Sequence, residues 1–227
     1  MNKSTSLYFL FTILAITFFS CKKVGDNEKI TEPNESIEGY MSTKEGSWWL
    51  YASADGEVFK RYATGQKAQQ LGLEFDYYES VDTNTNNITP EYFAKNEDKF
   101  MMLIDITGNQ DDYVMAVVQK DDPKVGDSWS NTKSMTYSGI SMDVLIEGKV
   151  VAINQTKTIK GQTFNNIVEV ENILKAKTLV TPYVNCGTAR LWFSQGLGLV
   201  KMEINLNVLS FYTRSYSDEL IDFHIEE

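Results

Sequence analysis

The chain has 227 residues, with 21 Lys and Arg against 31 Asp and Glu, and a formal net charge of -10 at pH 7. This charge argues against nucleic-acid binding, because such proteins need a basic surface to neutralise phosphates. A single histidine, His224, disfavours zinc sites built on His and catalytic sets that need a His base. Two cysteines cannot form a disulfide framework, and 42% hydrophobic content suffices for a packed core.

The first twenty residues have the order of a secretory signal peptide. A short polar start with Lys3 precedes an apolar run of thirteen residues at 7–19, which Ser20 and Cys21 follow. A helix of that length spans only ~20 Å, against a hydrocarbon core of ~30 Å, so it is no ordinary transmembrane segment. We therefore expect residues 1–20 to be removed as a signal peptide.

Residues 18–21 resemble the lipobox of bacterial lipoproteins, in which the cysteine becomes the lipidated first residue. Ser20 matches the small residue before the cysteine, and Phe18 stands where Leu is usual. The resemblance implies that Cys21 is a lipid anchor with two or three acyl chains, which suffice for stable membrane attachment. Lys22 replaces the Asp associated with inner-membrane retention, so the expected location is the outer membrane, facing the periplasm or the cell surface. An acidic chain would be repelled by an anionic surface, so lipid must hold it there.

Residues 21–40 are polar, contain Pro33 and lack apolar periodicity, which predicts a flexible tether. About twenty such residues reach roughly 25 Å. From residue 41 to residue 227 we expect one all-β domain, because apolar and polar residues alternate with period two. The alternating segments lie at 71–81, 100–106, 200–204 and 221–225.

Turn residues separate the alternating segments at short intervals, for example at 54–56, 64–65, 107–109, 123–126, 147–149 and 160–161. This spacing, without any convincing helical stripe, predicts an antiparallel curved sheet, a sandwich or barrel of roughly ten or more strands. Residues 113–118 are apolar on both faces and should form a central or doubly covered strand. Residues 89–94 fit either a short helix that starts at Pro90 or a strand, and we favour the strand.

Four short motifs occur in an order that resembles a broad group of bacterial secreted lipoproteins with an all-β domain. They are GSWWLY at 46–51, PKVGDSW at 123–129, GQTFNNI at 161–167 and WFSQGLGLVK at 192–201. The resemblance covers most of residues 41–227 and implies the fold, but the group has no agreed activity. Gly196 and Gly198 flank Leu197, which suits a bulge or sharp bend; a ligand that approaches this backbone is the alternative.

Two kinds of acidic chemistry are considered. Glu169 and Glu171 share one face of an expected strand, at a separation that suits a pair of catalytic carboxylates. Because Val168 and Val170 occupy the other face, the simpler interpretation is that the two glutamates form the solvated side. The segments 105–112 and 82–87 place oxygen-bearing side chains as a calcium loop does, but both lack the required Gly and terminal acid, so we expect hairpin loops and no metal site.

Aromatic residues offer a third kind of site, because exposed rings stack on sugars and buried rings line apolar cavities. The chain has 12 Tyr, 12 Phe and 4 Trp, and neighbouring aromatics on a strand must point to opposite faces. The alternative is that a curved sheet covered on both faces needs large side chains on both. The candidate ligand-binding residues are Trp48, Trp49, Tyr77, Tyr78, Trp192 and Tyr212.

The sequence therefore predicts a lipid-anchored, non-catalytic envelope protein without cofactor. Its expected partner, besides the membrane, is a small apolar or glycan ligand or another protein. Two alternatives stay open: a hydrolase of glycosidase type that uses carboxylates alone, and a structural or assembly component of the outer envelope. A barrel mouth lined by Trp and Tyr would favour ligand binding, and a filled barrel would favour the structural role. Two acids that face one cleft would favour the hydrolase.

Overall fold

The computed structural model describes residues 41–105, 113–137, 139–208 and 212–226, and these form twelve β-strands and no helix. The expected tether and signal peptide lie outside the described residues. Among the residues described, no helix is long and apolar enough to cross a membrane. The strands are β1 (Trp48–Ser53), β2 (Val58–Gln70), β3 (Leu73–Asp82), β4 (Ile88–Asn96), β5 (Lys99–Asp105), β6 (Tyr113–Lys120), β7 (Ser128–Tyr137), β8 (Ile140–Ile159), β9 (Gln162–Thr178), β10 (Val184–Ser194), β11 (Gly198–Val208) and β12 (Tyr212–His224).

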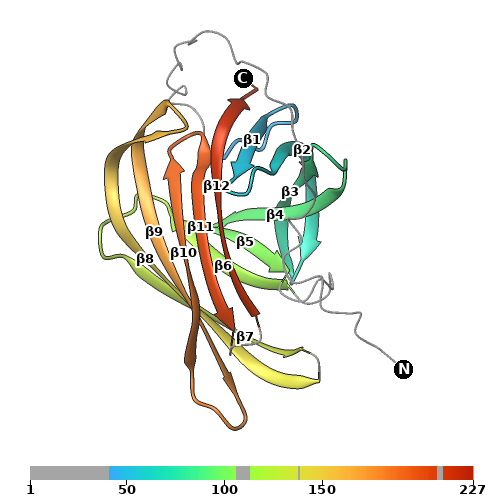
Figure 1. Cartoon of the computed structure of the whole chain (residues 1–227), viewed down its shortest axis with the longest axis vertical. Helices are drawn as coiled ribbons and strands as arrows, with labels where there is room; N and C mark the ends of the chain where they lie inside the picture. Colours follow the sequence, from blue (N-terminus) through green and yellow to red (C-terminus); the bar gives the residue numbers. More distant parts are fainter. Residues whose placement is uncertain (1–40, 106–112, 138, 209–211, 227) are drawn as a thin grey trace.

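All twelve strands belong to one antiparallel sheet, in the order β6-β5-β4-β3-β2-β1-β12-β11-β10-β9-β8-β7. The chain thus makes two meanders, β1–β6 and β7–β12, which join where β1 pairs with β12 and Trp48 lies opposite His224. The sheet curls until β6 approaches β7, which gives a nearly closed barrel (Figure 1). The expected all-β, antiparallel class is confirmed, as a barrel, and residues 88–96 form a strand as favoured.

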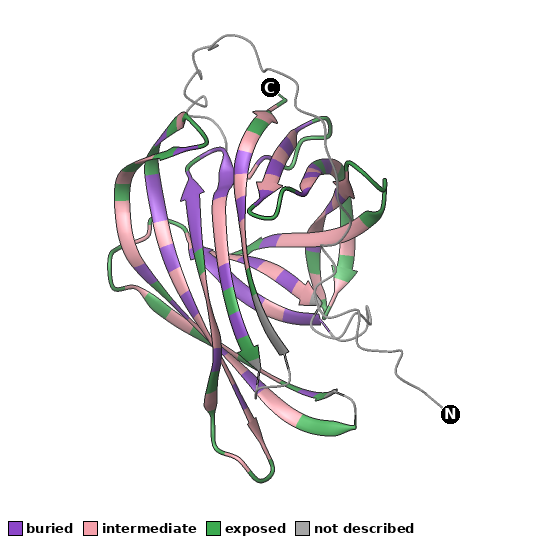
Figure 2. Ribbon diagram, in the orientation of Figure 1, coloured by how far each residue is buried: buried purple, intermediate pink, exposed green. Residues whose placement is uncertain are grey.

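Large apolar side chains fill the barrel between its two walls. Alternate residues of β6, at Val114, Ala116 and Val118, pack against residues of β8 to β11 such as Val170 and Phe193. This alternation is the predicted period of two, because successive side chains of a strand point to opposite faces. The buried bands of Figure 2 follow the same pattern along β8 to β11.

The opposite face of β3 to β6 carries a separate apolar cluster. Phe75, Met101, Tyr113 and Val117 belong to it and are all at least 94% buried. β6 is therefore covered on both faces, as its sequence predicted, although it stands at one end of the strand order rather than in the centre.

Side chains of β7 close the seam between β6 and β7. Trp129 Nε1 donates a hydrogen bond to Val117 O at 2.7 Å, and Asn131 Nδ2 donates to Met115 O. Trp129 lies opposite Gly148 on β8, where a Cβ atom would overlap the indole nitrogen. Gly148 thus leaves the space that lets the indole reach the free edge of β6, which otherwise presents unpaired carbonyl groups.

The far ends of β8 and β9 fold towards β12. Gln162 Nε2 donates to Ile221 O at 2.9 Å, and Lys160 Nζ lies 3.3 Å from Glu219 Oε2. Three register shifts between β8 and β9 bend the hairpin into this position. Trp192 is 7% exposed and packs in the same apolar cluster as Ile159 at the end of β8.

We predict that Gly148→Ala destabilises the fold by about 2–4 kcal/mol, because the added methyl group displaces Trp129 and breaks its bond at the seam. Urea denaturation measures the free energy of unfolding. In a Trp129→Ala background the same Gly148→Ala change should cost much less, since the clash is gone. Equal costs in both backgrounds would contradict this account of the seam.

Candidate functional site

A chain of hydrogen bonds crosses the barrel interior from β4 to β11. Arg61 Nε on β2 donates to Glu91 Oε2 on β4 at 2.5 Å, and Arg61 Nη1 donates to Tyr51 OH on β1 at 3.1 Å. The Tyr51 hydroxyl donates in turn to Leu199 O on β11 at 2.8 Å. We call these four groups the interior relay. Its members link strands of both meanders across the barrel.

The Arg61 guanidinium stays charged although only 4% of the residue is exposed. Burial alone lowers the pKa of Arg61, but the Glu91 carboxylate and the Tyr51 hydroxyl outweigh that effect and raise it above its usual value. Burial also raises the pKa of Tyr51 to about 12, so this hydroxyl keeps its proton and can donate it to Leu199 O. The relay is therefore a satisfied ion pair between the buried Arg61 and the half-buried Glu91, with a neutral phenol beside it.

Asp218 is a second buried acid on the interior face. It is 2% exposed, and the Ser53 hydroxyl donates a hydrogen bond to its Oδ1. Its Oδ2 has no hydrogen-bond partner among the described residues. Burial raises the pKa of the Asp218 carboxyl. Arg61 opposes this rise and Glu91 adds to it, so the charges of the interior relay influence the pKa of Asp218.

The void beside Arg61 is too small for a ligand. Its volume is about 30 Å³, which is the share of liquid volume that one water molecule takes. Ligand pockets usually measure ~300–1,000 Å³. The void is lined from both walls by Arg61, Phe93, Met102, Val118, Leu191, Phe193, Leu199 and Met202.

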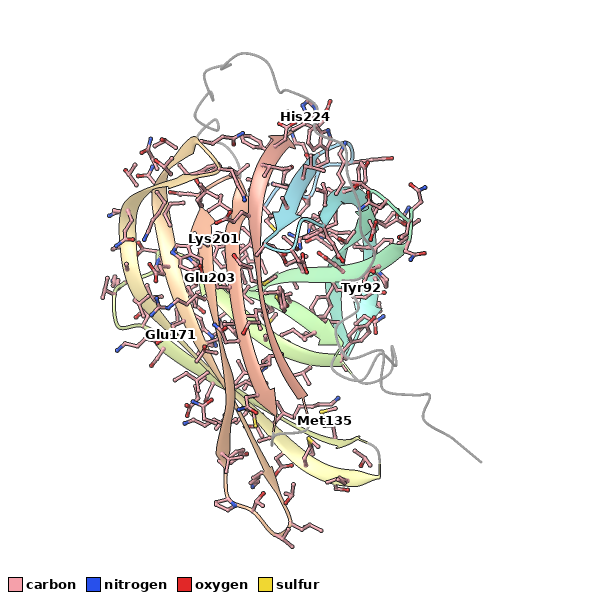
Figure 3. The ribbon with its side chains drawn as sticks, in the orientation of Figure 1. Tyr92, Met135, Glu171, Lys201, Glu203 and His224 are labelled. Carbon is pink, nitrogen blue, oxygen red and sulfur yellow. The ribbon has the colours of Figure 1, made fainter. Side chains whose placement is uncertain are left out.

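A shallow polar hollow of about 220 Å³ lies on the outer face of β9, β10 and β11. Figure 3 shows Glu171 and Glu203 on this face, with Lys201 nearby. Arg190 lies between the two glutamates in register, and its Nη2 is 3.3 Å from Glu171 Oε1. Thr188 and Asn205 complete the lining. Arg190 pairs with Glu171 inside the hollow, whereas Glu203 pairs with Lys201 and Asn205 accepts a hydrogen bond from the Ser215 hydroxyl. All five lining residues are polar, so the hollow offers no apolar floor.

The predicted aromatic candidates do not converge on one site. Trp49 and Tyr78 point inwards, are fully buried, and have ring centroids 6.1 Å apart. Trp48 and Tyr77 point outwards, as the rule of opposite faces predicted. Trp48 stacks on His224 at 6.3 Å, with Lys60 Nζ 3.7 Å from its ring centroid, whereas Tyr77 packs against Tyr92 at 5.7 Å on another part of the surface.

Two further candidates complete that set. Trp192 lies on the outer face of β10, beneath the end of the β8–β9 hairpin, with Lys201 Nζ 5.5 Å from its ring centroid. Tyr212 begins β12, but its side chain lies outside the described residues. Cys21, the expected lipid anchor, also lies outside them, and Cys186 is buried at 1% exposure.

The glycine-flanked segment at 196–198 has a structural role. It forms the turn between β10 and β11, where Gly196 and Gly198 have φ angles of +75° and +104°. Leu197 is 2% exposed, and its carbonyl accepts a hydrogen bond from Trp49 Nε1 at 2.7 Å. A register shift at Trp192 lies close to this turn. The motif therefore holds the two meanders together.

The remaining acidic candidates also have structural partners. Glu169 and Glu171 lie on the outer face, where they pair with Lys157 and Arg190, while Val168 and Val170 are buried. The segment 82–87 is the β3–β4 turn, and Asp82 Oδ1 accepts backbone hydrogen bonds at 2.7 and 2.9 Å. The segment 106–112 lies outside the described residues. Within the described ranges, no cluster of three His, Cys, Asp or Glu side chains is placed to hold a metal ion.

Sequence reasoning missed the interior relay and Asp218. Arg61 alternates with Phe59 and Ala63, and Asp218 alternates with Leu220, so each charge stands on an apolar face. A charge at a core position of an alternating strand was the available signal, because such a charge needs a buried partner. The partner itself, Glu91, lies thirty residues from Arg61 in the sequence.

We predict that Glu91→Gln destabilises the protein by about 3–5 kcal/mol, because Arg61 is then buried without its counter-charge. The double variant Arg61→Met with Glu91→Leu removes both charges and should recover most of that loss. Urea denaturation of both variants and the wild type decides the matter. A single variant as stable as wild type, or a double variant no better than the single, would show that the ion pair is not buried as described.

The raised pKa of Asp218 predicts a pH dependence of stability. The native state binds this proton more tightly than the unfolded state, so the stability that the group contributes is present below its unfolded pKa of ~3.9 and is lost as the pH rises through the higher native value. Asp218→Asn removes this titration. The stability of Asp218→Asn relative to wild type should therefore increase between about pH 4 and about pH 7. Asp222→Asn, at an exposed position of the same strand, is the matched control, and a difference independent of pH would contradict the expectation.

Comparison with known proteins shows the fold. No protein-family model matches the chain, and no curated protein sequence matches it. A solved structure of a candidate lipoprotein from Parabacteroides distasonis ATCC 8503 has 12% sequence identity and a TM-score of 0.53; the match covers 82% of this chain and 98% of that one.

A second solved structure is a candidate exported protein with a YmcC-like fold from Bacteroides fragilis NCTC 9343. Its identity is 13% and its TM-score 0.51, with 82% of this chain and 99% of that chain covered. At such low identity the likeness establishes the barrel architecture alone. The chain therefore shares its fold with a candidate lipoprotein and a candidate exported protein.

Proposed function

We propose that this protein is a lipid-anchored, non-catalytic component of the bacterial outer envelope that acts by binding through its outer surface. The observation that carries the proposal is the filled interior. Apolar side chains from both walls and the interior relay occupy the barrel, and the void beside Arg61 measures about 30 Å³. A small apolar ligand has no room in this void, so we assign binding to the outer surface of the barrel.

The proposed anchor rests on the sequence of residues 18–21 and gains support from the fold. The two solved neighbours are named as a candidate lipoprotein and a candidate exported protein. The first described residues lie at one end of the barrel, since Ser42 contacts Ser47, which accepts a hydrogen bond from Glu226 N. A tether that leaves from this end would hold the body roughly 25 Å from the membrane.

The rival hydrolase finds two of its required features inside the barrel. Glu91 and Asp218 face the same interior, and burial raises the pKa of Asp218. A substrate must lie between two such acids, yet neither acid lines the interior void beside Arg61, and that void has room for only about one water molecule. Glu91 is also neutralised by Arg61. The geometry therefore favours a structural role for both acids.

The anchor is tested by growth with radiolabelled palmitate. We expect label on the wild-type chain and on Cys186→Ser, and none on Cys21→Ser, because only Cys21 follows the signal peptide. Density-gradient fractionation should place the labelled protein with outer membranes and release Cys21→Ser from them. Label on Cys21→Ser, or a wild-type chain that stays unlabelled, would overturn the proposed anchoring.

A further inference from the structure

The β9–β10 turn and the start of β8 form an exposed apolar end of the barrel. Ile140 is the first residue of β8, two residues before Met142, which pairs with Thr178 at the end of β9. Leu179 is 96% exposed, Val180 90% and Ile140 50%. We call Ile140 together with residues 178–183 the hairpin end. Figure 1 shows the β9–β10 hairpin projecting beyond the rest of the barrel, and Figure 2 shows its turn as exposed.

The hairpin end differs from the rest of the chain because it carries no charge. The chain has 31 acidic residues, yet none occurs from residue 172 to residue 202, and residues 178–189 carry no charge at all. The nearest charges form pairs on the stem: Lys177 Nζ is 3.0 Å from Asp143 Oδ2, and Lys175 Nζ is 2.6 Å from Glu147 Oε2. An acidic protein thus has one projecting end without acids.

The side chains follow the order found at a membrane interface. Leu179 and Val180 form the tip, Tyr183 stands behind them at 37% exposure, and Lys177 Nζ lies 5.0 Å from the Tyr183 ring centroid. Aliphatic groups favour the acyl region, Tyr favours the headgroup level, and Lys extends its ammonium group towards phosphate and water. Two to three turn residues beyond Tyr183 reach at most ~7–10 Å, which matches the depth of interfacial insertion.

We propose that the hairpin end inserts into the interfacial region of a lipid bilayer. A lipid surface explains the absence of acids, because phosphate headgroups repel carboxylates. It also fits the small size of the tip: a stable protein interface buries ~800 Å² per partner, more than two projecting aliphatic side chains supply. Shallow insertion of a few apolar groups gives weak, reversible attachment.

Together with the proposed lipid anchor, this insertion fixes the orientation of the body. The tether begins beside Ser42, Ser47 and Glu226, at the end where β12 finishes, whereas the hairpin end lies beyond the start of β12. β12 alone has 13 residues and spans ~40 Å, more than the tether's reach of roughly 25 Å. The barrel therefore lies tilted along the membrane, held at both ends. This orientation rests on the proposed anchoring. The insertion of the hairpin end is proposed independently of the anchor.

Vesicle flotation tests the insertion on a chain that lacks residues 1–21, so that no acyl chain contributes. The deletion removes no described strand, since all twelve lie between Trp48 and His224. We expect this chain to bind phosphatidylcholine vesicles at millimolar lipid. Leu179→Asp with Val180→Asp should weaken binding at least tenfold. The matched control, Ile88→Asp with Val125→Asp, changes aliphatic residues that are 58% and 61% exposed and should alter binding less than twofold.

Site-directed spin labelling gives an independent readout of depth. In the shortened chain Cys186 is the sole native cysteine and is 1% exposed, so a nitroxide on Val180→Cys reports the tip and one on Val125→Cys serves as control. Vesicles should increase oxygen collisions at position 180 and leave position 125 unchanged.

No vesicle binding by the shortened chain, equal losses in the tip and control variants, or a tip label that stays in water would each overturn the proposal. Self-association abolished by the tip substitutions, without vesicle binding, would overturn it in favour of a second copy of the chain. Because these experiments use an unlipidated protein, their failure is distinct from failure of palmitate labelling at Cys21.

Discussion

The interior relay is the constraint that sets the spacing of the strands around the barrel interior. Arg61 brings a charge into the centre of the barrel, and Glu91 and the Tyr51 hydroxyl satisfy it there. The Tyr51 hydroxyl then bonds Leu199 O on the far meander, as Trp49 Nε1 bonds Leu197 O. A buried charge tolerates little movement of its partners, so the relay holds β1, β2, β4 and β11 at fixed distances. A sheet of twelve strands, which would enclose a wide lumen if it were round, is thereby kept filled.

A filled barrel leaves binding to its outer surface. The two meanders differ there, because strands of the second meander are longer: β8 has 20 residues and β9 has 17, against 6 for β1. One end of the β8–β9 hairpin folds back and bonds β12 through Gln162. The other end continues past the body with β10 and presents Leu179 and Val180 to solvent. The same long strands therefore seal the barrel at one end and build its one strongly apolar projection among the described residues at the other.

The sequence predicted those features of the fold that follow from the alternation of apolar and polar residues along a strand. Alternation identified the strands, placed Trp48 and Trp49 on opposite faces, and assigned Glu169 and Glu171 to the solvated side. It did not predict that β1 pairs with β12, or that Trp129 closes the seam over Gly148. Strand order and seam contacts depend on residues far apart in the chain, whose proximity a single sequence does not encode in its local pattern.

The candidate site was predicted less well for a related reason. Aromatic residues were chosen for their chemistry, but a strand divides neighbouring rings between its two faces, so Trp49 and Tyr78 serve the interior while Trp48 and Tyr77 lie apart on the surface. The charge of Arg61 at a core position was visible in the sequence, yet its meaning required the position of Glu91. The hairpin end was not recognised in the sequence. Leu179 is exposed because the β9–β10 hairpin extends beyond the neighbouring strands.

The central claim is that side chains fill the barrel interior, so that it holds no ligand. Native mass spectrometry of the protein released gently from the membranes of its own host tests this most directly. The account predicts the mass of the chain with its covalent lipid and no further stoichiometric small molecule. A bound molecule present at one copy per chain, and lost when Arg61 and Glu91 are replaced by Met and Leu, would contradict it.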